Sequence, residues 1–271
     1  MLRTRILTAV VLLALFAGVF IMLDARQFAI AMIMVGALAS FEWAKLCFSG
    51  RMVPSLLFAI AITAALLVLF NNPRASTLLP FVIYSGALAW CLSPLLLVAL
   101  KGRKSPPRLS ALFGVVIIIP SVAAILLLRQ SVNQQIIYLW ILLLIVSFAD
   151  IGAYFFGRAF GRHKLAPAIS PGKTIEGAIG GMLSAAVVGS IALSLSPFEI
   201  KPGLFIWLGI CIVTAVFSIF GDLTESLFKR MAGVKDSGTL LPGHGGILDR
   251  IDGVLAAAPV FTSMLLLTGF L

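Results

Sequence analysis

Nine apolar runs, each roughly long enough to cross a bilayer as a helix (about 20 residues), fill most of this sequence and restrict its possible folds more than any other feature. Only 11% of the residues are charged, whereas about a quarter are charged in a typical soluble domain. We therefore expect an all-α integral membrane protein, a polytopic helical bundle of about nine transmembrane helices. The runs are Ile6–Leu23, Phe28–Phe48, Val53–Phe70, Leu78–Leu100, Leu109–Leu128, Ile136–Gly157, Ile175–Leu195, Gly203–Asp222 and Gly253–Leu271.

Basic residues are distributed unevenly among the connections between these runs. Of the 20 Lys and Arg residues, 16 lie in the N-terminus and the even-numbered connections, and 4 lie in the odd-numbered ones. Without the last two even connections, whose basic residues catalysis could require, the count is still 8 against 4. Cytoplasmic loops are enriched in Lys and Arg, so we expect the N-terminus inside and the C-terminus outside.

The net charge of +10 fits this topology and a contact with anionic lipid headgroups. No nucleic acid is expected as a partner, because no basic stripe lies on a soluble domain. The acidic residues divide the chain into two parts: Asp24, Glu42 and Glu199 are scattered, whereas the other seven of the 10 form polar clusters between Asp150 and Asp252. We expect residues 1–135 to form an N-terminal transmembrane scaffold of about five helices. Residues 136–271 would form a C-terminal transmembrane catalytic region with its active site facing the cytoplasm.

The first polar cluster ends the eighth run. Asp222, Glu225 and Lys229 follow one another at i, i+3 and i+7, so they lie on one face of a helix. Carboxylates at the edge of the hydrocarbon are expensive and usually bind an ion, a substrate or a charged partner. Such binding and a structural ion pair with Lys229 or Arg230 explain this cluster equally well.

The second polar cluster contains Asp249 and Asp252 and follows a glycine-rich turn. Carboxylates in a first helical turn suit the helix dipole, so capping is one explanation. Glycines also let backbone N–H groups approach an anion, and hard oxygen ligands beside cations are what metal-assisted phosphate chemistry requires. We favour this second explanation, because four cations lie close in the sequence. They are Lys229, Arg230, Lys235 and Arg250.

The third polar stretch, Phe148–Gly177, begins with Asp150, Tyr154 and Arg158 on one helical face. Its glycines would allow close approach of a neighbouring helix. They are Gly152, Gly157 and Gly161.

Ser170 and Pro171 are expected to be the N-cap and the first residue of the helix in the seventh run. Lys173 would then lie near that helix N-terminus, where substrate binding and plain capping are equally good explanations. Of the two histidines, His244 in the glycine turn is the better candidate for a phosphate contact, and His163 is expected at the membrane interface.

The segment Ser226–Asp252 resembles the signature of phosphatidate cytidylyltransferases, also called CDP-diacylglycerol synthases. That signature has a serine, then Lys-Arg, Lys-Asp, a His-Gly-Gly turn and Asp-Arg-hydrophobic-Asp. The matching residues are Ser226, Lys229-Arg230, Lys235-Asp236, His244-Gly245-Gly246 and Asp249-Arg250-Ile251-Asp252. The stretch Phe148–Gly177 is also similar to this family, at Asp150, Gly157-Arg158, Ser170-Pro171 and Lys173-Thr174.

The resemblance implies a multi-pass enzyme of the bacterial inner (plasma) membrane that serves phospholipid biosynthesis. It would be a nucleotidyltransferase that transfers a cytidylyl group from CTP to phosphatidic acid, giving CDP-diacylglycerol and pyrophosphate. The implied cofactor is Mg²⁺, and a second cation, including a monovalent one, is compatible with the pattern. The family also implies a homodimer with a bundle-like helical core.

Site roles follow from the resemblance together with the residue types. Asp222 and Asp249 are expected to be the metal ligands, because both flank the site at helix ends. The expected catalytic residues are Lys229, Arg230, Lys235, Asp236, His244, Arg250 and Asp252. The expected substrate-binding residues are Asp150, Arg158, Ser170, Lys173, Thr174, Glu225 and Ser226.

Two other classes of membrane protein fit this sequence less well. An ion-coupled transporter of an anionic solute would use Asp150 and Asp222 as relay groups. It predicts inverted repeats and broken helices at the midplane, whereas the charges here gather at one face. A lipid phosphotransferase that consumes CDP-lipid carries a different aspartate-rich signature, which this sequence lacks.

Overall fold

The computed structural model describes residues 18, 22–100, 106–130, 136–197, 202–241, 243 and 245–271. Within them, eight helical segments are long and apolar enough to cross a membrane, and each coincides with an expected run. The expected fold class, a polytopic helical membrane protein, is confirmed. The remaining expected run, Ile6–Leu23 at the start of the chain, lies outside the described residues apart from Gly18, Met22 and Leu23. The helices are α2 (Ala25–Cys47), α3 (Met52–Asn71), α4 (Ala75–Cys91), α5 (Ser93–Ala99), α6 (Pro107–Gln130), α7 (Ile136–Phe160), α8 (Ile175–Ser194), α9 (Leu204–Met231) and α10 (Leu248–Leu267).

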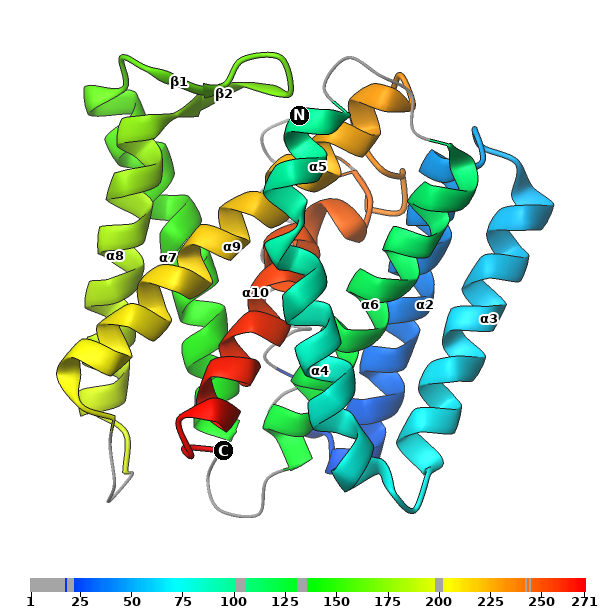
Figure 1. Ribbon diagram of the computed structural model, residues 1–271, viewed down its shortest axis with the longest axis horizontal. Helices are drawn as coiled ribbons and strands as arrows, with labels where there is room; N and C mark the ends of the chain where they lie inside the picture. The colour runs from blue at the N-terminus through cyan, green and yellow to red at the C-terminus, as the bar shows by residue number, and fades with distance from the viewer. Residues whose placement is uncertain are drawn as a thin grey trace.

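The ends of the helices gather at two opposite sides of the bundle (Figure 1). Helices α2 and α3, α7 and α8, and α9 and α10 are connected at the upper side in Figure 1, where α5 also ends and α6 begins. Helices α3 and α4 are connected at the lower side, where α8 ends and α9 begins. The basic even-numbered connections therefore meet at one end of the bundle, as the sequence predicts. That this end faces the cytoplasm stays a prediction.

Helix α10 lies near the middle of the bundle and packs against α4, α6, α7 and α9 (Figure 1). Its residues Ala256, Ala257 and Ala258 are fully buried, because small side chains let neighbouring helices approach closely. Phe261, also fully buried, contacts the rings of Tyr138 and Trp207 on α7 and α9. Both halves of the chain thus contribute helices around α10.

A proline in α10 is compensated by a side chain from α6. Pro259 has no N–H group, so the carbonyl of Leu255 one turn earlier loses its helical hydrogen bond. The hydroxyl of Ser121 on α6 donates to that carbonyl. Nearby, a Cβ atom on Gly86 of α4 would lie 2.2 Å from Pro120 of α6, so only glycine fits at this crossing. The contacts hold α4, α6 and α10 together at one level.

Helices α7 and α8 approach through glycines, as the sequence predicts for Gly152. A Cβ atom on Gly152 would lie 2.3 Å from the hydroxyl oxygen of Ser184 and 2.9 Å from the carbonyl oxygen of Gly180, both on α8. A Cβ atom on Gly181 would lie 2.5 Å from the carbonyl oxygen of Ala149. The two helices therefore pack almost backbone to backbone.

A short antiparallel hairpin, β1 (Lys164–Ala166) and β2 (Ser170–Thr174), connects α7 to α8. The expected helix start at Ser170 and Pro171 is wrong, because Ser170 pairs with Ala166 and the chain stays extended up to Thr174. Thr174 is the N-cap of α8, and its hydroxyl accepts from the backbone N–H of Gly177 at 3.1 Å. Lys173 is the strand residue directly before this N-cap, so it lies near the start of α8 as expected, and its ammonium group lies beside Asp222 of α9.

Candidate active site

The charged end of α9 forms the base of the site. This helix continues to Met231, well beyond the expected end of its apolar run at Asp222, and Lys229 and Arg230 in its last turn suit the helix dipole. Asp222, Glu225 and Lys229 consequently share one face of a single helix, as their spacing predicts. Helix α10 likewise begins at Leu248, before the expected Gly253, so that it includes Asp249 and Asp252.

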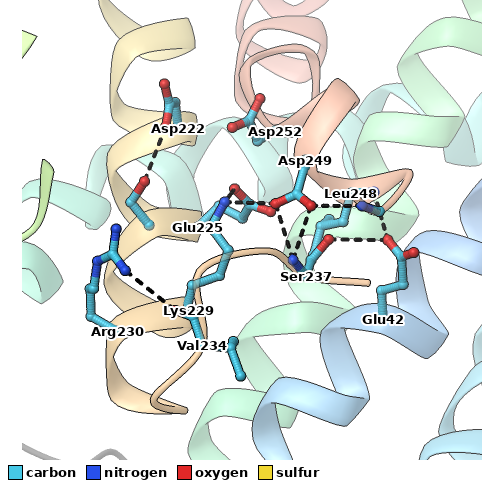
Figure 2. Close-up of polar contacts among 12 residues, drawn as sticks. Glu42, Asp222, Glu225, Lys229, Arg230, Val234, Ser237, Leu248, Asp249 and Asp252 are labelled. Atoms are coloured by element: carbon cyan, nitrogen blue, oxygen red, sulfur yellow. Dashed lines mark hydrogen bonds and ion pairs between the residues drawn. The ribbon is translucent and has the colours of Figure 1, made fainter. Parts of the chain in front are cut away.

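Lys229 lies between two buried carboxylates (Figure 2). Its Nζ atom is 2.6 Å from Oε2 of Glu225 and 2.7 Å from Oδ1 of Asp249. The three side chains are 12%, 3% and 6% exposed, so these charges are largely removed from solvent. The ion pair between Glu225 and Lys229 that the sequence allowed is therefore present, and Asp249 from the next helix completes it.

Asp222 has a different cation as its partner. Its Oδ2 atom is 2.6 Å from Nζ of Lys173 on β2, and its Oδ1 atom accepts from the hydroxyl of Ser226 at 3.2 Å. The side chain of Asp150 on α7 also interacts electrostatically with Lys173 and Asp222. The third polar stretch of the sequence thus meets the first at one site.

Three carboxylates come close enough to share a cation. Among the described residues, Asp222, Glu225 and Asp252 each offer an oxygen within 4.8 Å of the other two. Oε1 of Glu225 is buried and has no hydrogen-bond partner there. Asp249, the second metal ligand expected from the sequence, does not belong to this group. Hard carboxylate oxygens in this number are suitable ligands for Mg²⁺.

Asp249 instead holds the turn that precedes α10 (Figure 2). Its Oδ2 atom accepts from the backbone N–H groups of Ser237 at 2.9 Å and of Gly246 at 2.7 Å. Gly245 has a φ of +83°, and a Cβ atom there would lie 2.5 Å from the same oxygen. One N–H group of the glycine turn, that of Gly246, therefore approaches an anion, which in this structure is the carboxylate of Asp249. A contact of the turn with a substrate phosphate stays a prediction.

A family model described as the cytidylyltransferase family matches residues 3–268. The chain belongs to this family. It is 38% identical over 279 residues to the phosphatidate cytidylyltransferase of Pseudomonas aeruginosa, with 100% of this chain and 99% of that protein covered. It is 36% identical over 283 residues to the phosphatidate cytidylyltransferase of Haemophilus influenzae, with 97% and 98% covered. Over 132 residues, about half of each chain, it is 48% identical to the same enzyme of Staphylococcus haemolyticus.

These matches confirm the family resemblance carried by Ser226–Asp252, and with it the interpretation of the chain as a nucleotidyltransferase. The roles of its individual residues remain predictions that the geometry informs. Family membership also disfavours the transporter and the phosphotransferase that uses CDP-lipid.

The other expected site residues that the structure describes lie around this centre at the same end of the bundle. Arg230 donates to the carbonyl oxygen of Ile169 at 3.4 Å, which connects α9 to the hairpin. Arg158 donates to the hydroxyl of Tyr154 at 3.2 Å, as their spacing on α7 permits. The exposed residues at the rim include Arg158, Arg230, Lys235, Asp236 and Arg250. Ser170 and Thr174 lie at the two ends of β2, and His244 lies outside the described residues.

Two residues at the site escaped the sequence analysis. By its position in the sequence Glu42 belongs to the scattered acids of the expected scaffold, yet its Oε2 atom accepts from the backbone N–H of Leu248 at 2.8 Å. Ser237 donates its hydroxyl to the same oxygen at 3.2 Å and its backbone N–H to Asp249. A signal for Glu42 was present, because a carboxylate inside an apolar run is expensive and usually functional.

Proposed function

We propose that this chain transfers a cytidylyl group from CTP to phosphatidic acid, giving CDP-diacylglycerol and pyrophosphate for phospholipid biosynthesis. The observation that carries the proposal is the meeting of Lys173, Asp222 and Lys229 with the acids of α10 at one end of a membrane bundle. The relatives that match over their full length carry the name of this activity. One substrate is a water-soluble nucleotide and the other is a lipid, so the reaction requires a charged site at a membrane edge.

The reaction exchanges one P–O bond for another. An oxygen of the phosphatidate phosphate attacks the α-phosphorus of CTP, and the bond to the bridging β-phosphate oxygen breaks, so that pyrophosphate leaves with that electron pair. The attacking oxygen is already anionic, so no strong general base is needed. The task of the protein is to position the two phosphates and to neutralise the charge between them.

Mg²⁺ is the proposed cofactor, and Asp222, Glu225 and Asp252 are the residues that would hold it. These three and Asp249 are four carboxylates with only two lysine partners, so the site carries an excess of negative charge that a divalent ion would reduce. When bound, the ion would polarise phosphate oxygens and neutralise their charge. The proposal requires one such ion and does not depend on the second cation that the sequence left open.

The remaining cations divide into two groups by exposure. Arg230, Lys235 and Arg250 are exposed at the rim, so we assign them to the phosphates of CTP and to the leaving pyrophosphate. Lys173, beside Asp222, is assigned to the phosphate of phosphatidic acid. Lys229 is held between Glu225 and Asp249, so its role is to position these carboxylates and not to reach for substrate.

We also propose a location and an assembly. The site would face the cytoplasm from the bacterial inner (plasma) membrane, because the basic connections lie at its end of the bundle and CTP is water-soluble. A homodimer is proposed from the family resemblance alone.

The test is the formation of CDP-lipid from labelled CTP and phosphatidic acid by the purified protein in detergent. The wild type should form CDP-lipid and pyrophosphate in equal amounts, and EDTA should stop the reaction until Mg²⁺ is restored. Asp252→Asn should raise the Mg²⁺ concentration for half-maximal rate by at least about 10- to 100-fold. Loss of a side chain that only supports a metal ligand already weakens metal binding by that factor, and Asp252 is a proposed ligand itself. Asp24→Asn is the matched control, because Asp24 caps α2 at the opposite end of the bundle and Asn also caps helices.

Asp249→Asn separates the two candidate ligand sets. We expect it to lower kcat through the turn and Lys229 while shifting the Mg²⁺ dependence less than Asp252→Asn does. The reverse order of the two shifts would assign the metal to Asp249, as the sequence predicts. A folded wild type that forms no CDP-lipid from any of several lipid phosphates would refute the proposed function.

A further inference from the structure

Glu42 is a buried acid from the N-terminal half of the chain that reaches the site. Glu42 lies on α2 and is 1% exposed. Its Oε2 atom accepts from the backbone N–H of Leu248 at 2.8 Å and from the hydroxyl of Ser237 at 3.2 Å (Figure 2). Its Oε1 atom has no hydrogen-bond partner among the described residues. Burying a carboxylate with an unsatisfied oxygen destabilises a fold, so packing alone does not account for an acid at this position.

The carboxylate of Glu42 fits tightly against both ends of the turn before α10. A Cβ atom on Gly238 would lie 2.3 Å from Oε1, and a Cβ atom on Gly246 would lie 2.4 Å from Oε2. These two glycines leave just enough room for the carboxylate. The turn and the acid therefore hold each other in one position.

Helix α10 depends on Glu42 for its N-terminal cap. The residue at the N-cap position, Ile247, has no side chain that can accept a hydrogen bond. In many helices the N-cap residue, such as Ser, Thr, Asp or Asn, accepts from the backbone N–H of the second or third helical residue. Here the backbone N–H of Leu248 is satisfied by an acid on another helix, which also fixes where α10 begins relative to α2.

The contacts of Glu42 continue to the reacting centre through Ser237. The hydroxyl of Ser237 donates to Glu42, and its backbone N–H donates to Asp249. Asp249 then pairs with Lys229, and Lys229 pairs with Glu225 of the carboxylate group. A displacement of Glu42 would therefore be transmitted to the start of α10 and to its two acids.

We propose that Glu42 is a positioning residue for the cytidylyl transfer, acting with Ser237 to hold the first turn of α10 so that Asp249 and Asp252 face α9. The proposal rests on the proposed function for its kinetic effect. Positioning requires the carboxylate of Glu42 only as a hydrogen-bond acceptor, because Leu248 and Ser237 both donate to it and Oε1 has no hydrogen-bond partner among the described residues. A glutamine, whose amide oxygen can accept both bonds, should therefore replace it, whereas a methionine of similar size should not.

The test compares Glu42→Gln, Glu42→Met and Ser237→Ala in the full-length protein in detergent. Glu42→Met should lower kcat about 10- to 100-fold and raise the half-saturating Mg²⁺ concentration, as loss of a supporting partner does at metal sites. Glu42→Gln should stay close to the wild type in both. Ser40→Ala is the matched control, because Ser40 is equally buried on α2 and donates to Ala37 of its own helix. Hydrogen exchange of residues 237–250 should rise in Glu42→Met and not in the control.

Several results would overturn the proposal. One is a folded Glu42→Met variant with the kcat, the Mg²⁺ dependence and the hydrogen exchange of the wild type. Another is a Glu42→Met variant that loses only thermal stability. If Glu42→Met does not fold, Ser237→Ala decides, because it keeps the bond to Leu248 and removes only the hydroxyl: a lower kcat at unchanged stability supports the proposal, and wild-type kinetics refute it. An inactive wild type would refute the proposed function instead, and the hydrogen exchange would still test the positioning.

Discussion

Replacing Lys229 by methionine is the most informative perturbation of this site. Methionine has a similar length and no charge, so Lys229→Met would leave Glu225 and Asp249 close together with no ammonium group between them. Both carboxylates are almost fully buried. Removing one partner of a buried ion pair destabilises proteins by about 3–5 kcal/mol, whereas an exposed pair is worth about 0–1 kcal/mol. We expect the larger value here.

A second substitution shows how much of the lost stability comes from each of the two carboxylates. Glu225→Gln alone leaves Lys229 paired with Asp249, so it should cost only about 1–3 kcal/mol, as for a lost hydrogen bond to a charged group. The double variant Glu225→Gln/Lys229→Met leaves one buried carboxylate where Lys229→Met leaves two. It should therefore be more stable than the sum of the single effects predicts.

The assay is equilibrium unfolding by SDS in mild detergent micelles, followed by tryptophan fluorescence, since Trp43, Trp90 and Trp207 are all buried. Lys45→Met is the control, because Lys45 lies in the last turn of α2 and its ammonium group lies over the ring of Phe41, not between two buried carboxylates. A loss below about 1 kcal/mol for Lys229→Met, equal to that of the control, would refute the reasoning, since it would mean that solvent screens the site.

Two further substitutions test the turn and the bundle. Gly245→Ala should destabilise the turn by about 1–2 kcal/mol through its positive φ and should lower CDP-lipid formation through its contact with Asp249. Gly209→Ala on α9, which has open space around it, should behave like the wild type in the same assay. Ser121→Val should lower the free energy of unfolding by about 1–3 kcal/mol, because the Leu255 carbonyl beside Pro259 loses its donor. Unchanged unfolding of Ser121→Val would mean that this carbonyl finds another donor.

Regular features of this protein could be predicted from its sequence. Apolar runs reveal membrane helices because the bilayer imposes a minimum length, and the shared face of Asp222, Glu225 and Lys229 follows from helical periodicity. Helix ends were less certain, because polar residues such as Glu225 and Lys229 can extend a helix beyond its apolar run. The expected cap at Ser170 was wrong for a related reason. Ser170 pairs with Ala166 in the hairpin, whereas the rule for N-caps considers only the residues that follow.

Contacts between distant segments could not be predicted. The pair of Lys173 with Asp222 depends on how the hairpin lies over α9, and the choice of Asp249 for Lys229 depends on the rotation of α10. Both are set by packing across the whole bundle. Glu42 was missed for the same reason, because the sequence indicates that an acid is buried but not what it meets.

The position of α10 shows why the scaffold and the site cannot be separated in this fold. Two hydrogen bonds between helices of the N-terminal half and α10 lie at different heights: Glu42 accepts from the N–H of Leu248, and Ser121 donates to the carbonyl of Leu255. These points are about two turns apart, or roughly 10 Å along the axis. Two anchors at different heights restrict both the sliding and the tilt of a helix, whereas one would leave the tilt free. Asp249 and Asp252 lie between the anchors, so their directions toward α9 depend on residues that bind no substrate.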